Sequence, residues 1–184
     1  IWVPSHIYPQ SFPIEKVGRD NIVEKGYSDD AIVKLAPDGK ILFEKSLSKI
    51  FIDNGLEYLI FSMGSDNFRL DPIHLNDIQP VDFDGEFWNK GDVFLSLRNQ
   101  SMVLLYRPTT NKIIWKGTGP FFHQHDVDIL NSKKISVFNN NSKDFVDGRV
   151  VDGNNEVIIY DFKKNEYSYY LNESLIKNDV RTLT

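Results

Sequence analysis

The chain has 184 residues, of which 41% are hydrophobic and 13% aromatic, so it is long and apolar enough to bury a sizeable core. Its formal net charge of -5 argues against a general nucleic-acid binder, since such proteins usually carry a basic patch or stripe. The sequence has no cysteine and no run of eighteen apolar residues, which excludes disulfides, thiolate nucleophiles, thiolate zinc sites and an encoded membrane-spanning helix.

The first strands in chain order predict an incomplete four-stranded sheet over residues 1–46. The stretch IWVPS reads as a second strand, and residues 31–45 read as a third and a fourth strand joined by the turn sequence PDG. Two long insertions, Tyr8–Asp29 and Leu47–Asp71, extend this part to residue 72. Loops of this length are often functional lids or binding loops.

The second insertion has mixed apolar character. Its pattern predicts a short helix, which the dipeptide Asn54-Gly55 would break. The apolar residues of this predicted helix are Ile50, Leu56, Leu59 and Ile60.

Residues 73–119 and 123–171 each predict a complete sheet of four antiparallel strands. The strands of the first sheet read HLNDIQPV, DVFLSLR, MVLLYRP and KIIWKG. Those of the second sheet read HDVDIL, KISVF, EVIIYDF and EYSYYL. Residues 173–184 carry only a weak apolar run, and we expect them to start a further element.

A polar excursion at residues 139–155 interrupts the second complete sheet. It offers carboxylate and amide oxygens but lacks the spacing of a calcium-binding loop. A plain solvated loop is therefore the favoured prediction, and a bound cation is the alternative. The oxygen ligands of that alternative are Asp144, Asp147, Asp152 and Asn154.

The two complete sheets repeat with a period of 51 residues, because His74 opens the first and His125 opens the second. A period of this size built from short strands is typical of a β-propeller, in which each blade is a four-stranded antiparallel sheet. The predicted fold is therefore all-β, an incomplete segment of a larger propeller. Fewer than four blades cannot close a ring, so we expect the segment to need the rest of its own chain to close the propeller.

The predicted strand order gathers basic side chains on one rim of the propeller channel. His74 and His125 start innermost strands, and Arg98 ends a second strand. Because neighbouring strands are antiparallel, the end of a second strand lies beside the start of the innermost one. His6 ends the second strand of the incomplete sheet and joins the same rim. Basic groups around a channel mouth predict an anion site.

Residues 73–141 resemble the arylsulfotransferase family, the bacterial aryl sulfate sulfotransferases and their β-propeller relatives. The resemblance rests on IHLNDIQPV, VFLSLRNQS, KIIWKGTG, HQHDVDIL and ISVFNNN. Its motifs are a His-x-Asn that opens a strand, a Ser-x-Arg-x-Gln that ends the next, a Trp-containing strand, and a Gln-His before a strand that ends near Phe-Asn-Asn. A looser likeness begins at residue 31.

The resemblance implies an enzyme that moves a sulfuryl group from an aryl sulfate ester to a phenolic acceptor, without a cofactor. His125 matches the family histidine that is transiently sulfurylated, and His74 and Arg98 match groups that contact the sulfuryl oxygens. These roles fit the chemistry, because imidazole is a competent nucleophile near neutral pH and arginine offers a permanent charge in a planar fork. The family also implies a periplasmic or exported location. The expected substrate-binding residues are Asn76, His123 and His6.

Two positions depart from the pattern of the characterised bacterial enzymes. Asn99 follows the arginine where those enzymes tend to have a histidine, and Asp126 follows His125 where they have a small hydroxyl residue. A carboxylate beside an imidazole orients it or favours its protonated form. A further family histidine would belong to a blade ahead of Ile1. The alternative function is a non-catalytic propeller that binds an anionic ligand, a glycan or a protein through the same rim.

The candidate site residues also have structural interpretations. His125 and His74 are typical of residues that tie strands together within a blade, and Arg98 is a candidate for a bridge to Asp77 or Asp126. Imidazole and carboxylate also suit a metal, although we predict none. The ligands of that alternative are His123, His125, Asp126 and His74.

Aromatic side chains near the predicted rim have two interpretations. Trp115, Phe121 and Phe122 form either part of the packing between blades or a wall that binds an aryl group. Packing is the favoured prediction.

Overall fold

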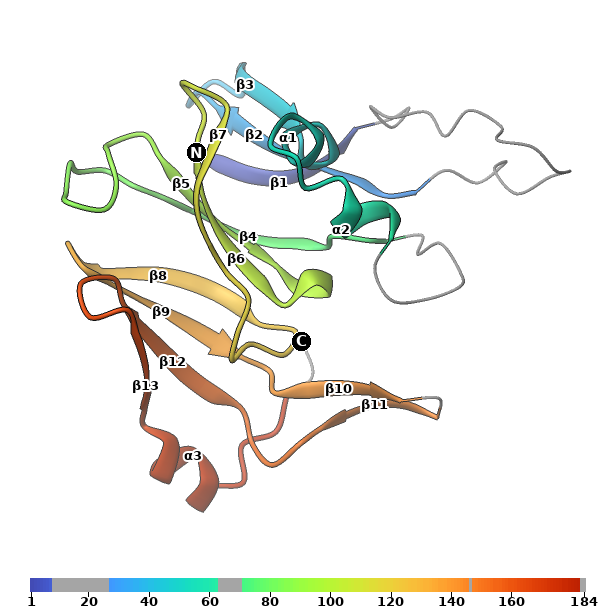
Figure 1. Ribbon diagram of the computed structural model, residues 1–184, viewed down its shortest axis with the longest axis vertical. Coiled ribbons are helices and arrows are strands. Elements are labelled where there is room, and N and C mark those ends of the chain that lie inside the picture. The colour runs from blue at the N-terminus through green and yellow to red at the C-terminus, as the bar shows by residue number, and fades with distance from the viewer. Residues whose placement is uncertain (8–26, 63–70, 146, 183–184) are drawn as a thin grey trace, which may run out of the picture. The chain divides into compact units, whose positions relative to one another are not determined.

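The computed structural model describes residues 1–7, 27–62, 71–145 and 147–182 (Figure 1). Antiparallel sheets dominate, so the predicted all-β class is confirmed, and the described strands form no closed barrel, as expected for an incomplete propeller segment. The chain divides into two compact units, Ile1–Leu75 and Asn76–Thr184. Most of the first predicted insertion and part of the second lie outside the described residues. No helix in the described part of the chain is long and apolar enough to cross a membrane.

The first unit contains a three-stranded sheet in the order β1-β2-β3. Its strands are antiparallel, with His6 opposite Asp30 in the first pair and Ala31 opposite Ser46 in the second. The pairing matches the second, third and fourth strands of the predicted incomplete sheet. The strand bounds are β1 Trp2–Ile7, β2 Asp29–Leu35 and β3 Ile41–Ser46.

Two short helices follow this sheet, α1 (Leu47–Asp53) and α2 (Tyr58–Phe61). Ser46 is the N-cap of α1, because its hydroxyl accepts the Lys49 N–H at 3.1 Å. The chain leaves α1 through Asn54 and Gly55, and the φ of +71° at the glycine is one that residues with a side chain rarely adopt. The predicted helical character and its break at this dipeptide are therefore confirmed, but as two short helices with Leu56 between them.

The second unit contains two four-stranded sheets, in the orders β4-β5-β6-β7 and β13-β12-β9-β8. In both sheets the sequence order of the four main strands equals their spatial order, as in the predicted blades. The strand bounds of the first are β4 Leu75–Pro80, β5 Val93–Leu97, β6 Met102–Arg107 and β7 Lys112–Gly117, with the turn η1 (Arg98–Gln100) after β5. Those of the second are β8 His125–Asn131, β9 Lys134–Asn139, β12 Glu156–Asp161 and β13 Glu166–Tyr170.

A continuous hydrophobic core joins the two sheets of the second unit. Apolar side chains from β5 and β6 pack with those from β8, β9 and β12, and Trp88 lies among them with 1% of its surface exposed. Burying one large apolar side chain stabilises a fold by about 1.5–3 kcal/mol, so this cluster dominates the stability of the unit. Its members include Phe94, Val103, Leu105, Val127, Ile135, Val137 and Ile158.

Trp115 on β7 belongs to this packing. Its ring stacks on Tyr160 at a centroid distance of 5.0 Å and contacts Phe162 at 4.8 Å. Phe121 is buried and meets Tyr167 edge to face at 5.7 Å. Packing is thus the observed role of Trp115 and Phe121.

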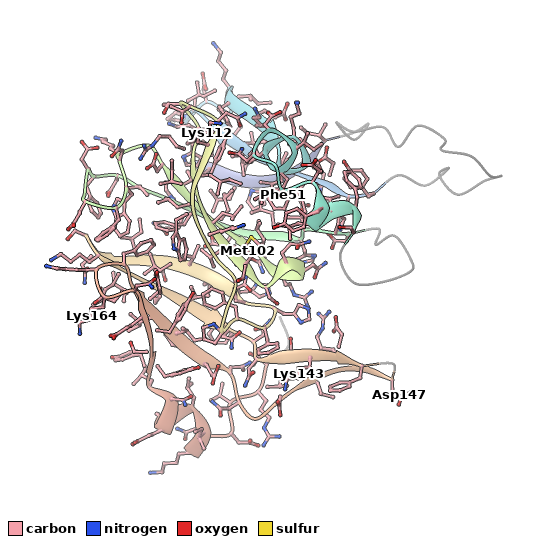
Figure 2. The ribbon with its side chains drawn as sticks, in the orientation of Figure 1. Phe51, Met102, Lys112, Lys143, Asp147 and Lys164 are labelled. Carbon is pink, nitrogen blue, oxygen red and sulfur yellow. The ribbon has the colours of Figure 1, made fainter. Side chains whose placement is uncertain are left out.

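The excursion at residues 139–155 is a β-hairpin, and the prediction of a plain loop was wrong. Strands β10 (Ser142–Phe145) and β11 (Gly148–Val151) pair antiparallel and extend away from the main sheet (Figure 1). Figure 2 shows Lys143 on β10 and Asp147 at the hairpin tip. Asp152 forms an ion pair with Lys143, and Asp144 accepts two hydrogen bonds from Arg149. These carboxylates therefore stabilise the hairpin.

The tail of the chain begins with a helix, α3 (Asn172–Lys177), and then returns to the second four-stranded sheet. The Thr182 N–H donates to Asn155 Oδ1 at 2.6 Å, and the Asn155 amide donates to the Thr182 carbonyl at 3.0 Å. Asn155 lies immediately before β12, and the tail is thus fixed at the start of a third strand.

The same kind of anchor occurs at the equivalent position of each repeat. The anchoring residue stands five positions before the equivalent residue of each repeated strand. The pairs are Asp30 and Leu35, Ser101 and Tyr106, and Asn155 and Tyr160. Asp30 accepts the Leu75 N–H at 2.7 Å, and Ser101 accepts the His123 N–H at 3.3 Å. A residue at the start of β2, β6 or β12 therefore holds the backbone of the segment that follows the same sheet in the chain.

Adding a methyl group at Gly117 should disturb the packing of Trp115. A Cβ at Gly117 would lie 2.5 Å from Cη2 of the Trp115 ring, whereas one at Gly119 would meet nothing within 4 Å. We expect Gly117→Ala to lower the free energy of unfolding by about 1–3 kcal/mol and Gly119→Ala to change it much less. Urea denaturation of both variants measures the difference, and equal effects would contradict the packing described above.

Asp30 should make the stability of the chain depend on pH. Burial raises the pKa of this carboxyl from 3.8 to about 6; Asp71 adds to the rise, while the Leu75 N–H, His6 and His74 oppose it. The folded state therefore holds the proton more tightly, and this contribution is fully present below about pH 3.8 and lost as the pH rises through about 6.

We expect the free energy of unfolding to fall between pH 4 and pH 7 by about 2 kcal/mol more in the wild type than in Asp30→Asn. The asparagine keeps an acceptor for the Leu75 N–H but does not titrate. Urea denaturation at the two pH values tests this. An identical pH dependence of the two proteins would show that Asp30 ionises normally.

Candidate active site

A buried polar network lies at one end of the two sheets in the second unit. Gln124 has no exposed surface, and its side-chain amide donates to Ser96 Oγ at 3.2 Å and to the Met102 carbonyl at 2.9 Å. The Asn76 side chain donates to the Gln124 carbonyl at 2.8 Å. Gln124 directly precedes His125, and Ser96 stands two residues before Arg98. The network thus includes one predicted site residue, Asn76, and fixes the chain next to two others, His125 and Arg98.

Arg98 is the first residue of η1 and is buried, with 8% of its surface exposed. Its Nη1 donates to Asn99 Oδ1 at 3.1 Å, and its buried Nε has no hydrogen-bond partner among the described residues. No carboxylate of the described chain forms an ion pair with it. A buried guanidinium without a counterion is unfavourable, so this position favours an anionic ligand.

The alternative bridge from Arg98 to Asp77 or Asp126 does not form among the described residues. The Asp77 carboxylate instead accepts the Val127 N–H at 2.9 Å, which ties β4 to β8. Burial raises the pKa of Asp77, and the nearby charges of Asp126 and Asp128 add to the rise. Asp77 is therefore a structural link between the two sheets.

Two amide oxygens close to this network are also buried without a donor in the part of the chain that the structure describes. They are Oδ1 of Asn76 and Oε1 of Gln124. A buried acceptor left unsatisfied costs about 1–3 kcal/mol, so both atoms suit a hydroxyl or N–H group of a ligand. Arg98 supplies hydrogen-bond donors and the two amides supply acceptors. This combination suits an anion that has a hydroxyl group itself or that binds next to a second ligand with one.

His125 is the first residue of β8 and pairs with Phe138 across β9. Asp126 follows it in a left-handed conformation, with φ of 43°, and the pairing register shifts between His125 and Val127. This irregularity is a bulge, a feature that re-aims side chains next to active sites. The sequence predicted the strand start but not the bulge.

His123 is held by the hairpin β10–β11. Its Nδ1 lies 3.1 Å from Ser142 Oγ, and its Nε2 lies 3.6 Å from a carboxylate oxygen of Asp144. Asp144 in turn accepts two bonds from Arg149. Both ring nitrogens of His123 thus face hairpin groups. Among the described residues, no group of three or more histidine and carboxylate side chains is arranged to hold a metal ion.

In the first unit, His6 and His74 each face a carboxylate. His6 Nδ1 lies 3.0 Å from Asp30 Oδ1, and His74 Nδ1 lies 2.5 Å from Asp71 Oδ2. Neither aspartate belongs to a motif in the sequence. Asp71 precedes His74 by three residues, which was the only available signal, and Asp30 is 44 positions away from it in the chain.

Phe122 is the exposed one of the three aromatic residues near the predicted rim, because Phe121 is buried and Trp115 is partly buried. Phe122 is 42% exposed, and Lys143 Nζ lies 5.5 Å from its ring centroid. A cation over an aromatic face is favourable by about 0.5–1 kcal/mol at an exposed site. Phe122 is therefore the most accessible to a ligand of the three predicted aromatic residues.

Comparison with known proteins identifies the family. The family model described as arylsulfotransferase (ASST) matches residues 1–184, which is the whole of the sequence. A search of curated proteins gives no match. The match agrees with the motifs around Asn76, Arg98 and His125 and with the four-stranded sheets that carry them. The chain therefore belongs to the arylsulfotransferase family.

Proposed function

We propose that this chain forms part of an enzyme that transfers a sulfuryl group from an aryl sulfate to a phenol through His125. Membership of the arylsulfotransferase family supports a sulfotransferase-type function in general. The observation that carries the proposal is Arg98, a buried guanidinium without a counterion among the described residues. Its planar fork of N–H donors matches the oxygens of a sulfate ester.

The first step transfers the sulfuryl group to the enzyme. A ring nitrogen of His125 attacks the sulfur, an N–S bond forms, and the S–O bond to the aryl group breaks with its electron pair on the departing phenolate. A phenolate leaves readily, because the pKa of its parent phenol is about 10. Arg98 and His74 stabilise the negative charge on the sulfuryl oxygens.

The second step regenerates the histidine. The oxygen of the acceptor phenol attacks the same sulfur, the N–S bond breaks, and its electron pair returns to the imidazole. The phenolic proton passes to a base, which is the departed phenolate or solvent. Oδ1 of Asn76 is a buried acceptor suited to the acceptor hydroxyl, and His123 and His6 are the other substrate-binding residues of this proposal.

The proposal also includes the predicted division into blades. One site can combine His6 and His74 of the first unit with Arg98 and His125 of the second only if the segments act as consecutive blades of one propeller. The proposed parts are an incomplete blade over 1–46 with insertions to 72, blades over 73–119 and 123–171, and a further element over 173–184.

One observation favours the alternative function. His6, His74 and His123 face Asp30, Asp71 and Asp144, and these carboxylates offset the positive charge expected at the rim. The alternative is a non-catalytic propeller that binds an anionic ligand, a glycan or a protein, and this charge balance suits its glycan or protein form rather than an anion. The adduct experiment below separates the two functions.

We expect a covalent intermediate on His125. Intact-mass spectrometry of the protein after incubation with 4-nitrophenyl sulfate should show a transient gain of about 80 Da, one sulfuryl group, that is absent in His125→Ala. Lys164→Ala, which changes an exposed residue of the β12–β13 turn, should form the adduct normally. An adduct that persists in His125→Ala would assign the nucleophile to another residue. Release of no phenol and formation of no adduct would favour the binding function.

Arg98 should determine the affinity for the anion. Millimolar phenyl sulfate should raise the thermal unfolding midpoint of the wild type, because a ligand present at 100 times its Kd stabilises a protein by about 2.7 kcal/mol. Arg98→Gln should lose most of this response and Arg98→Lys should keep part of it, because lysine retains the charge but not the fork. Equal midpoint increases in all three proteins would place the anion elsewhere.

A further inference from the structure

His74 adopts a backbone conformation that is unusual for a residue with a side chain. Its φ is 57°, in the left-handed region that favours glycine. Such a conformation costs on the order of 1–3 kcal/mol and persists only where the surroundings impose it. The contacts of His74 within the first unit therefore identify groups that hold it in this conformation.

Two aspartates impose this conformation, one on the backbone and one on the ring. Asp30 is buried, and its Oδ2 accepts the N–H of Leu75, the residue after His74, at 2.7 Å. Asp71 Oδ2 lies 2.5 Å from Nδ1 of the His74 ring. Both the main chain and the imidazole are thus held by carboxylates.

The charge of Asp30 is not needed for the backbone anchor. The equivalent residues of the other repeats, Ser101 and Asn155, make the corresponding backbone contact with neutral side chains. Among the described residues of the first unit, the charged groups near His74 include Asp71 in direct contact, Asp30 at longer range, and His6, which pairs with Asp30.

We propose that Asp71 is a positioning residue for His74, holding Nδ1–H so that the ring meets the sulfuryl oxygens through Nε2. This inference rests on the proposed function. The group bonded to one imidazole nitrogen determines which nitrogen carries the proton in the neutral ring, and an adjacent carboxylate favours the imidazolium. An imidazolium held in this way donates an N–H to an anionic oxygen, which is what the role assigned to His74 requires.

The state of the ring is tested by ¹⁵N NMR of the full chain, with the His74 nitrogens assigned by comparison with His74→Gln. The imidazolium, present at low pH, carries a proton on both nitrogens. At a pH where the ring is neutral, we expect the wild type to keep its remaining proton on Nδ1, which reports the contact with Asp71. Asp71→Ala should shift the proton toward Nε2, while Asp71→Asn should keep it on Nδ1, because the amide oxygen still accepts a bond there. Asp53→Asn, which changes a carboxylate paired with Lys49 on α1, should leave the His74 signals unchanged.

The same variants are then assayed for turnover of 4-nitrophenyl sulfate. Asp71→Ala should lower kcat/KM by about tenfold or more, the size of effect typical of residues that orient a functional histidine, and Asp71→Asn should recover part of the loss. Asp53→Asn should retain wild-type activity.

The NMR and turnover measurements distinguish failure of the positioning role of Asp71 from failure of the proposed sulfuryl transfer. If Asp71→Ala leaves the His74 ring nitrogens unchanged, or alters them without lowering turnover in an active enzyme, the positioning role is overturned. If the ring responds as expected but the wild type and every variant lack turnover and form no adduct, sulfuryl transfer is overturned, while Asp71 is still shown to orient His74.

Discussion

The buried amide of Gln124 is the interaction on which the candidate site depends. A fully buried amide must find its hydrogen bonds inside the protein, and the NH2 group of Gln124 donates to Ser96 and Met102 of the neighbouring sheet. Asn76 completes the link by donating to the Gln124 carbonyl. These bonds determine where β8 starts relative to β5, and so where His125 stands along its sheet relative to Arg98.

Apolar packing and polar anchoring have separate tasks in this chain. The apolar core of the second unit, around Trp88 and Phe94, holds its two sheets together. Apolar contacts are not directional, so they do not determine the register of the strands at the rim. Register is selected by polar side chains that hold a neighbouring backbone, such as Asp77 on Val127 and Ser101 on His123. Because buried polar groups must be paired, a shifted register would leave several of them without partners.

The arrangement of charges distinguishes Arg98 from the histidines of the proposed site. Arg98 is buried with no described counterion, whereas His74 and His123 face Asp71 and Asp144. A buried permanent cation without a counterion favours an anionic ligand. An imidazole beside a carboxylate is held in one ring orientation. Anion binding and histidine orientation are thus assigned to different parts of the site.

The sequence alone determined the strands of the main sheets, their order within each sheet, the break in the helical insertion and the family. The strands and the break follow from apolar alternation and turn residues, which act over a few neighbouring residues, and the family follows from the order and spacing of short motifs. The tertiary structure decided the partners of the site residues, because they come from distant positions: Asp30 and Leu75 are 45 residues apart, and Asn76 and Gln124 are 48 apart. It also decided that residues 142–151 form a hairpin, since cross-strand pairs such as Asp144 with Arg149 stabilise a polar segment that has no apolar alternation to predict it.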